Sequence, residues 1–225
     1  MRGDGGSPTT TVEYLDPSVP ESLACRDVPL VAATDAALGD LGAIVDDPND
    51  FAVEIVPWPV SGWRALDPGT GVEGGTTTGV FEVWWEGEFL FGRNEAVDGH
   101  YLLGWSTDPS MAVRGPVPKK APRRVLLWHV NYHPDGGQLF FPLDGSPFVV
   151  PLARPGDDLT PGDLVAFQVS GGQGLYIPPG VWHDAAFPIG PRGRFHDVQG
   201  RVHARVSCNI AREFGVLLSV PLPAV

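Results

Sequence analysis

Residues 129–145 read HVNYHPDGGQLFFPLDG, a stretch in which two strand-forming runs flank a Pro-Asp-Gly-Gly turn. Because successive side chains of a strand point to opposite faces, His129, Asn131 and His133 share one face of the first run. The turn can return Gln138, the first residue of the second run, to a position beside His133. The stretch therefore predicts a polar site carried by antiparallel strands.

A second stretch, GQGLYIPPGVWH at residues 172–183, has the spacing Gly-x5-Pro-x-Gly-x2-His. Its corner at 178–180 combines proline, which fixes one backbone angle, with glycine, which tolerates positive φ. His183 follows this corner at the start of a new strand, with a defined facing. We expect it to bring a second imidazole to the same interior as His133.

Outward from these two stretches, strand-like runs recur at roughly ten-residue spacing with Pro and Gly turns between them, which is typical of sandwiches and barrels. The runs 80–85 and 88–91 are joined across Glu86-Gly87 as a tight hairpin. The fold class is therefore predicted to be all-β, a jelly-roll barrel. The predicted strands are 27–32, 51–56, 80–85, 88–91, 100–105, 125–133, 138–141, 148–152, 164–169, 174–177, 181–187, 201–209 and 216–220.

The remaining segments are predicted to be a helix, loops and an arm. An N-cap signal precedes a short helix over 36–44, the one helix of consequence that we expect. The Gly- and Thr-rich segment 66–79 and the Gly- and Arg-rich segment 189–200 are predicted loops. Residues 1–24 are polar and are expected to form a loosely held arm, which leaves 25–225 as a single domain.

Composition narrows the class of protein. The chain has 225 residues with 29 glycines and 24 prolines, too many for a helical bundle because both residues interrupt helices. Its formal net charge of −12 disfavours nucleic-acid binding, since the molecule repels phosphate backbones. No apolar run is long enough to span a bilayer and the first residues are not those of a signal peptide, so we expect a cytoplasmic protein. Cys25 and Cys208 are expected to be free thiols.

The two stretches together resemble the paired motifs of the cupin superfamily, His-x-His-x3-4-Glu-x6-Gly and Gly-x5-Pro-x-Gly-x2-His. Asn131 stands at the first histidine of that pattern, His133 at the second and Gln138 at the glutamate. Gly145 and His183 match the remaining glycine and histidine. The resemblance implies the cupin double-stranded β-helix, with the site inside the barrel.

The cupin resemblance also implies a metal site, with two substitutions in it. His133, Gln138 and His183 are the candidate ligands, and His129 could join them if its strand tilts inward. Asn and Gln are neutral oxygen donors, which bind divalent metals more weakly than imidazole or carboxylate does. Two alternatives therefore remain. The site binds a divalent ion such as manganese, nickel, zinc or iron, or it works by acid and base catalysis without a metal.

Over residues 133–187 the sequence is similar to the ureidoglycolate lyase family, the cupin enzymes of allantoin breakdown. Residues 50–120 depart from the family pattern, and Asp184 stands where such lyases often carry a second histidine. The resemblance implies a lyase that cleaves a C–N bond of ureidoglycolate to give glyoxylate and urea. The runs that carry the likeness are 132–134, 138–143, 148–150, 173–176 and 180–183, with 36–44 similar to that family's N-terminal helix.

For that reaction the resemblance implies a base, an acid and a carboxylate anchor. His133 or His183 can serve as base or acid, because imidazole titrates near neutral pH. Gln138 and Asn131 could donate hydrogen bonds to the developing carbonyl oxygen. Arg205 is the candidate anchor, since it alternates with apolar residues in 201–209 and can bind a carboxylate through two hydrogen bonds.

Trp84 and Tyr176 complete the candidate substrate-binding residues. Two alternatives to the lyase stay open: a metal-dependent cupin oxygenase or isomerase acting on another small carboxylate, and a ligand-binding cupin without catalysis, because a fold alone does not fix function. For the lyase we expect a small carboxylate substrate, no nucleic-acid or membrane partner, and a homodimer.

Overall fold

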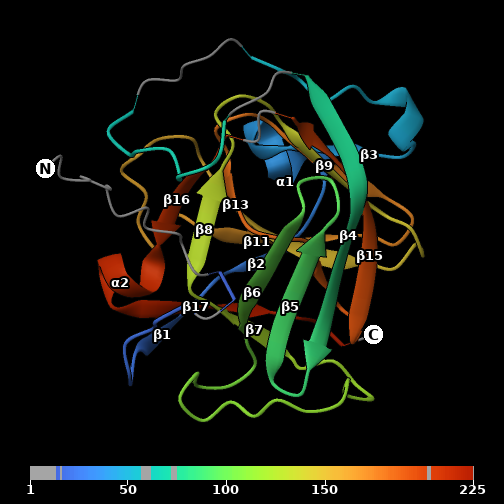
Figure 1. The fold of residues 1–225 in the computed structure, drawn as a ribbon. Helices are drawn as coiled ribbons and strands as arrows, with labels where there is room; N and C mark the ends of the chain where they lie inside the picture. Colours follow the sequence, from blue (N-terminus) through green and yellow to red (C-terminus); the bar gives the residue numbers. More distant parts are fainter. Residues whose placement is uncertain (1–13, 16, 57–61, 72–74, 202–203, 225) are drawn as a thin grey trace, which may run out of the picture.

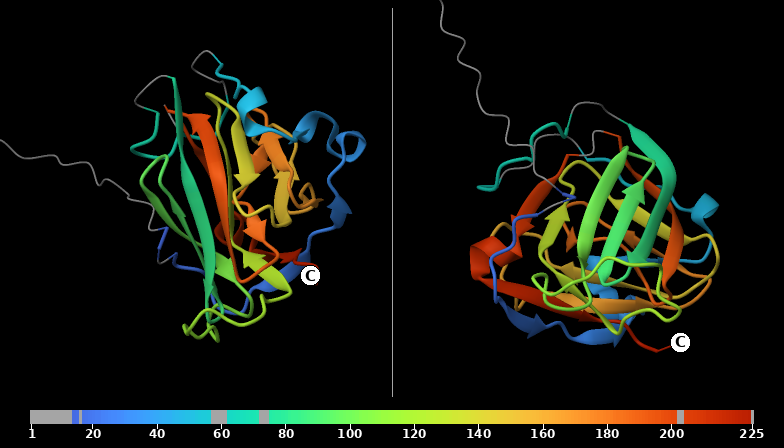
Figure 2. Two further views of the ribbon diagram at one scale, coloured as in Figure 1. Left: turned by 90° about the vertical axis from the view of Figure 1, so that its right-hand side faces the viewer. Right: turned by 60° about the horizontal axis from the view of Figure 1, so that its bottom comes forward.

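Two mixed β-sheets pack against each other and hold the hydrophobic core between them (Figures 1 and 2). The computed structural model describes residues 14–15, 17–56, 62–71, 75–201 and 204–224. Most neighbouring strands of these sheets are antiparallel, and the all-β prediction is confirmed.

The larger sheet contains the hairpin strands β4 and β5, which lie side by side in Figure 1. Among the described residues its order is β1 (Ala24–Asp27), β17 (Val216–Pro221), β7 (Arg124–Leu127), β6 (Gly99–Trp105), β5 (Phe89–Asn94), β4 (Thr76–Glu86), β15 (Arg192–Gly200), β9 (Gln138–Pro142), β12 (Gly174–Ile177) and β3 (Ala43–Val45).

The smaller sheet carries the strands of the His129–His133 and His183 stretches. Its order is β16 (Val206–Asn209), β8 (His129–Tyr132), β13 (Trp182–His183), β10 (Phe148–Ala153), β11 (Val165–Val169) and β2 (Leu30–Ala32), with β14 (Phe187–Pro188) paired to β10. The helices are α1 (Asp35–Leu38), η1 (Gly39–Leu41), η2 (Pro48–Asp50) and α2 (Ile210–Phe214). Within the described part of the chain, none is long and apolar enough to cross a membrane.

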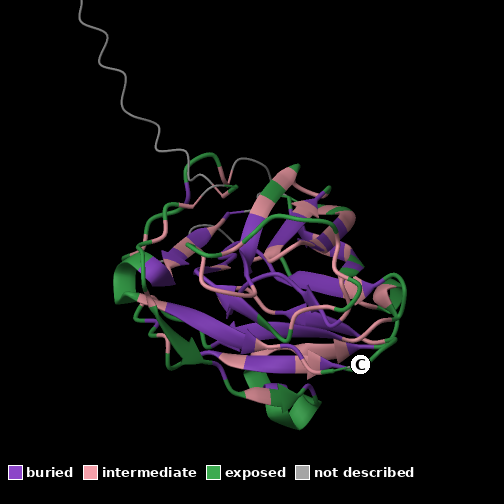
Figure 3. Ribbon diagram, turned by 90° about the horizontal axis from the view of Figure 1, so that it is seen from below, coloured by how far each residue is buried: buried purple, intermediate pink, exposed green. Residues whose placement is uncertain are grey.

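Alternation along the strands builds the core. In β4, Phe81, Val83 and Trp85 are buried, whereas the residues between them are only partly buried. The largest fully buried side chains are aromatic and come from both sheets, Trp85 from one and Trp182 from the other. Figure 3 shows buried residues following the strands through the middle of the molecule, with exposed residues at its rim.

The tight hairpin and the N-terminal helix are present as predicted, the helix in a shorter form. Glu86 pairs with Phe89 across a two-residue turn in which Gly87 has a φ of 60°. Helix α1 ends at Leu38 and η1 ends at Leu41. A side chain at the next residue, Gly42, would meet the Tyr176 carbonyl oxygen at 2.6 Å. The predicted end of the helix belongs instead to β3, which pairs with β12. Helix α2, capped by Asn209, was not predicted.

Two predicted segments take another conformation. The segment 51–56 is not a strand: it forms one isolated bridge, from Ile55 to Gly136, and Phe51 packs on the Tyr176 ring instead. The segment 189–200, predicted as a loop, contains the nine-residue strand β15, which pairs with β4 on one side and β9 on the other. Its glycines are compatible with a strand here because both neighbours hold it in register.

Several predicted boundaries were wrong. The strand predicted at 125–133 is divided into β7 and β8, which lie in different sheets, and that predicted at 181–187 is divided into β13 and β14. The strand predicted at 27–32 is divided at Pro29, which lacks an N–H, and its halves β1 and β2 pair in different sheets. Strand β16 begins only at Val206, and His203 lies outside the described residues. The predicted loop 66–79 ends early, because β4 already starts at Thr76.

Candidate functional site

A cavity of about 60 Å³ lies where the polar stretches of the two sheets meet. Pockets for drug-sized ligands hold roughly 300–1,000 Å³, so this one suits a small molecule. Of the predicted site residues, the structure brings His129, Asn131, His133, Gln138, His183 and Arg205 to its wall. The lining residues are Tyr14, Phe81, Asn94, Tyr101, Leu102, Leu103, Trp128, His129, Asn131, His133, Gln138, Phe140, His183, Asp184, Ala185, Gln199 and Arg205.

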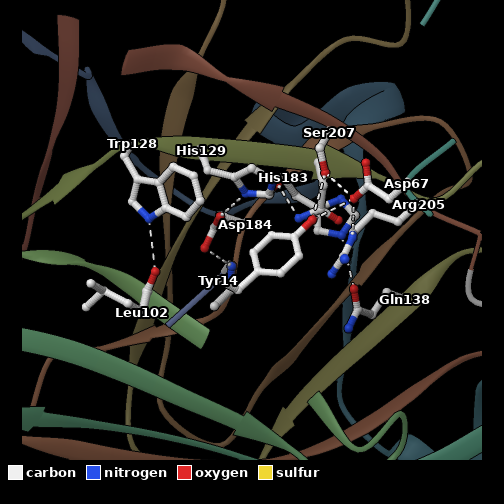
Figure 4. Close-up of polar contacts among 12 residues, drawn as sticks. Tyr14, Asp67, Leu102, Trp128, His129, Gln138, His183, Asp184, Arg205 and Ser207 are labelled. Atoms are coloured by element: carbon white, nitrogen blue, oxygen red, sulfur yellow. Dashed lines mark hydrogen bonds and ion pairs between the residues drawn. The ribbon is translucent and has the colours of Figure 1, made fainter. Parts of the chain in front are cut away.

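A hydrogen-bonded chain links the two predicted stretches. Nε2 of His183 lies 3.0 Å from the amide oxygen of Gln138, and Nε2 of Gln138 donates to Oδ1 of Asp197 at 2.6 Å. These residues come from β13, β9 and β15, so the chain crosses from one sheet to the other. Figure 4 shows His183 and Gln138 in this cluster.

Asp197 lies at the end of this series of hydrogen bonds, and it was not predicted from the sequence as a site residue. Its carboxylate is fully buried and accepts hydrogen bonds from three side-chain amides, those of Gln138, Asn94 (2.9 Å) and Gln199 (2.8 Å). Burial raises the pKa of Asp197 to about 6, and the three hydrogen bonds oppose that rise because they stabilise the ionised form. Asp197 lies within the segment 189–200, which was predicted to be a loop and forms β15.

The two motif histidines face each other, with ring centroids 5.2 Å apart. Nδ1 of His133 lies 2.9 Å from the Ala204 carbonyl oxygen, and Nδ1 of His183 lies 2.8 Å from the Val181 carbonyl oxygen. Burial is the main cause that lowers the pKa of His183 to about 3, with His133 nearby adding to it. His183 is therefore neutral at pH 7 and carries a single ring hydrogen.

His129 lies at another part of the same cavity, on the face it shares with Asn131. Its Nδ1 lies 3.5 Å from a carboxylate oxygen of Asp184. Its Nε2 is buried and has no hydrogen-bond partner among the described residues. A buried polar atom without a partner is costly, so this nitrogen is available to a bound ligand.

Arg205 points inward but is already paired. Its Nε donates to Oδ2 of Asp67 at 2.6 Å, and Asp67 also accepts from Tyr14 and Ser207. The guanidinium lies 4.3 Å from the centre of the Tyr14 ring. Figure 4 shows this ring between the Arg205–Asp67 pair and the His129–Asp184 contact. Tyr14 comes from the predicted arm, and burial raises the pKa of its hydroxyl.

Trp84 and Tyr176, which were predicted to bind substrate, are not among the described residues that line this cavity. Trp84 lies on the outer face of β4, where it donates to Glu86, while Trp85 faces the core. Tyr176 faces away from the cavity, where its ring packs on Phe51 and its hydroxyl accepts from the backbone N–H of Glu54. Trp84 occupies the outward position of an alternating strand, whereas all residues of β12, including Tyr176, are buried.

The predicted metal ligands are arranged for hydrogen bonding. Nε2 of His183 and Oε1 of Gln138, the atoms that would bind an ion, are directed at each other. Across the described residues, no group of three or more His, Cys, Asp or Glu side chains is placed to hold a metal ion. The contact between His183 and Gln138 accounts for these atoms by hydrogen bonding, and a metal at this site stays a prediction.

The lowered pKa of His183 predicts a pH-dependent stability. Between pH 6.5 and pH 3 the unfolded chain binds a proton at this residue that the folded chain does not, so stability falls as pH drops. From pH 7 to pH 5, this residue should cost the wild type about 2 kcal/mol, at about 1.36 kcal/mol per pH unit. Urea unfolding of His183→Gln should show a correspondingly smaller loss; equal losses in both proteins would disprove the assignment.

The segment that forms much of this cavity is similar in sequence to known proteins. A family profile described as ureidoglycolate lyase matches residues 106–213. "Ureidoglycolate lyase 2" of Rhizobium meliloti is 35% identical over 90 residues, 40% of this chain and 53% of that protein. The ureidoglycolate lyase of Stutzerimonas stutzeri is 44% identical over 71 residues, 32% of this chain and 42% of that protein. The ureidoglycolate lyase of Rhodobacter capsulatus is 44% identical over 66 residues, 29% of this chain and 40% of that protein. The chain thus spans about half or less of the length of these relatives.

The matched segment contains most of the polar wall of the cavity. It includes the hydrogen-bonded chain from His183 to Asp197, together with His129 and Arg205. It also includes both spaced motifs, 129–145 with Gln138 and 172–183 with His183. Over residues 106–213, this chain is therefore similar to the ureidoglycolate lyase family.

Proposed function

We propose that this protein is a C–N lyase that cleaves ureidoglycolate into glyoxylate and urea by acid–base chemistry. One observation carries the proposal: the family match at 106–213 contains the imidazoles, the amide and the guanidinium that converge on one small cavity. The relatives that share this segment are themselves named ureidoglycolate lyases.

The reaction transfers one proton within the substrate. The O–H bond of the hydroxyl and the C–N bond break, while the C=O bond of glyoxylate and an N–H bond of urea form. The O–H electron pair stays on oxygen, a lone pair of that oxygen becomes the second C=O bond, and the C–N pair goes to nitrogen. A catalyst therefore has to take the proton from oxygen and deliver it to nitrogen.

His133 is the residue that we assign to this transfer. Because its Nδ1 lies 2.9 Å from the Ala204 carbonyl oxygen, the hydrogen of the neutral ring is on Nδ1 and is donated to that carbonyl. Nε2 then carries a lone pair, which can accept the hydroxyl proton and return it to the leaving nitrogen. One imidazole thus serves as base and then as acid, and it ends the cycle in its starting form.

The other polar groups are assigned to binding. The amide of Gln138 donates to the oxygen that becomes the aldehyde carbonyl, with Asn131 beside it. Arg205, the one arginine or lysine among the described lining residues, attracts the substrate carboxylate. Nε2 of His129, whose Nδ1 faces Asp184, accepts a hydrogen bond from the ureido group.

Product analysis tests the proposal. Purified protein supplied with ureidoglycolate should release glyoxylate and urea in equal amounts, above the uncatalysed rate. Trp84→Phe is a matched control, which should keep the wild-type kcat/KM because Trp84 lies on the outer face of β4. A folded sample that released no glyoxylate above background, with or without added Mn²⁺, would refute the proposal.

A further inference from the structure

We propose that Asp197 is a positioning residue: it fixes which end of the Gln138 amide faces the reacting oxygen, and with it the ring nitrogen of His183 that carries the hydrogen. The inference rests on the proposed function, in which Gln138 donates to that oxygen. No role for Asp197 follows from the sequence motifs, which end before it.

Asp197 can impose an orientation because, in the part of the chain that the structure describes, its carboxylate is hydrogen-bonded by neutral amides. It is fully buried at the middle of β15, with a neighbouring strand on either side. Oδ1 takes the Gln138 hydrogen bond at 2.6 Å, and Oδ2 takes those of Asn94 and Gln199. All three donors are neutral amides, and no ion pair of Asp197 is found among the described residues.

A carboxylate accepts hydrogen bonds and has no hydrogen to donate. The NH2 end of the Gln138 amide must therefore face Asp197, because a reversed amide would press its oxygen against Oδ1. The NH2 group has a second hydrogen, which remains for the substrate oxygen. The opposite end of the amide, its oxygen, is then turned to Nε2 of His183.

The ring of His183 follows this orientation. Its two nitrogens both lie beside oxygen acceptors, Oε1 of Gln138 at 3.0 Å and the Val181 carbonyl at 2.8 Å, and they compete for the hydrogen of the neutral ring. An imidazole nitrogen can donate or accept, whereas the amide held by Asp197 offers Nε2 only an acceptor. The Val181 carbonyl likewise only accepts, so the two contacts compete for one hydrogen. The proposal places that hydrogen on Nε2, where the amide oxygen is held in position by Asp197 from the far side of Gln138.

Asp197→Asn should reverse the orientation of the Gln138 amide, although the asparagine side chain has nearly the same shape as the aspartate. Two donors, Asn94 and Gln199, meet at the Oδ2 position and one donor meets at Oδ1, so the new amide should keep its oxygen at the former and turn its NH2 group to Gln138. The Gln138 amide then reverses and presents NH2 to His183. The ring hydrogen should move to Nδ1, and the reacting oxygen should face a carbonyl oxygen where it had a donor.

The test is ¹⁵N NMR of the full chain labelled at histidine, recorded at pH 8, above the pKa of about 6 of Asp197. The His183 signals are assigned by their loss in His183→Gln. We expect Nε2 to carry a hydrogen in the wild type and to lose it in Asp197→Asn. Asn94→Ala is the matched control: it removes one donor from Oδ2 but leaves the Oδ1 contact, so Nε2 should keep its hydrogen.

Kinetics supply the second readout. Asp197→Asn should lower kcat by ~10²–10³-fold, the effect of losing one oxyanion donor, with KM little changed. Asn94→Ala should lower kcat less. An Nε2 without hydrogen in the wild type, or one that keeps its hydrogen in Asp197→Asn, would overturn the inference. The NMR result does not depend on turnover, so a wild type inactive on ureidoglycolate would refute the proposed function without touching this test.

Discussion

His133→Asn should lower kcat on ureidoglycolate by ~10²–10⁴-fold, the usual contribution of a general acid–base residue. The asparagine amide can still donate to the Ala204 carbonyl oxygen, as Nδ1 of His133 does, so the local structure should be kept. What the variant lacks is the Nε2 lone pair that takes the hydroxyl proton. Steady-state kinetics of glyoxylate release measures the loss.

Thermal stability is the control that shows whether the His133→Asn variant keeps its fold. Thermal unfolding of His133→Asn and of the wild type should agree within a few degrees, because the substituted side chain keeps its buried hydrogen bond. A folded variant with a kcat within threefold of the wild type would remove His133 from the proton transfer. The base would then have to be sought at His129, whose Nε2 has no described partner.

Arg205→Gln should reduce both stability and substrate affinity. The side chains of Arg205 and Asp67 are 11% and 9% exposed, so the variant leaves a carboxylate in the interior without its countercharge. Breaking a buried ion pair from one side costs about 3–5 kcal/mol. The same substitution removes the proposed carboxylate anchor, so KM should rise at least tenfold. Urea unfolding and substrate titration measure the two effects.

A double variant separates these effects. Arg205→Gln combined with Asp67→Asn removes both charges and should recover a large part of the stability, while the rise in KM should persist. If the double variant regained the wild-type KM, Arg205 would act only as the partner of Asp67. A loss of stability below about 1 kcal/mol in Arg205→Gln would contradict the buried pairing.

Much of the fold could be predicted because apolar alternation and turn residues mark its strands. The hairpin of β4 and β5 is an example, since its inward residues are apolar and glycine lies at its turn. Strand β15 was missed because this signal is absent from it. Its inward residues include Asp197 and Gln199, so the strand that completes the polar site has no apolar face for sequence reasoning to find.

The motif spacing located the polar residues of the site, but it did not show which of them meet residues from distant segments. Tyr14 and Asp67 enter the site through contacts with Arg205, more than 130 residues away from either. Where both sides of a strand are buried, the sequence did not show to which side a given side chain points. All residues of β12 are buried, so alternation gave no reason to turn Tyr176 away from the cavity.

The measurement that tests the central claim most directly is a time course of ureidoglycolate, glyoxylate and urea with equal amounts of the wild type and His133→Asn. The wild type should convert substrate to the two products in a one-to-one ratio. The variant should be slower by at least a hundredfold. Substrate that disappears at the same rate with either protein, or without protein, would show that this cavity does not perform the lyase reaction.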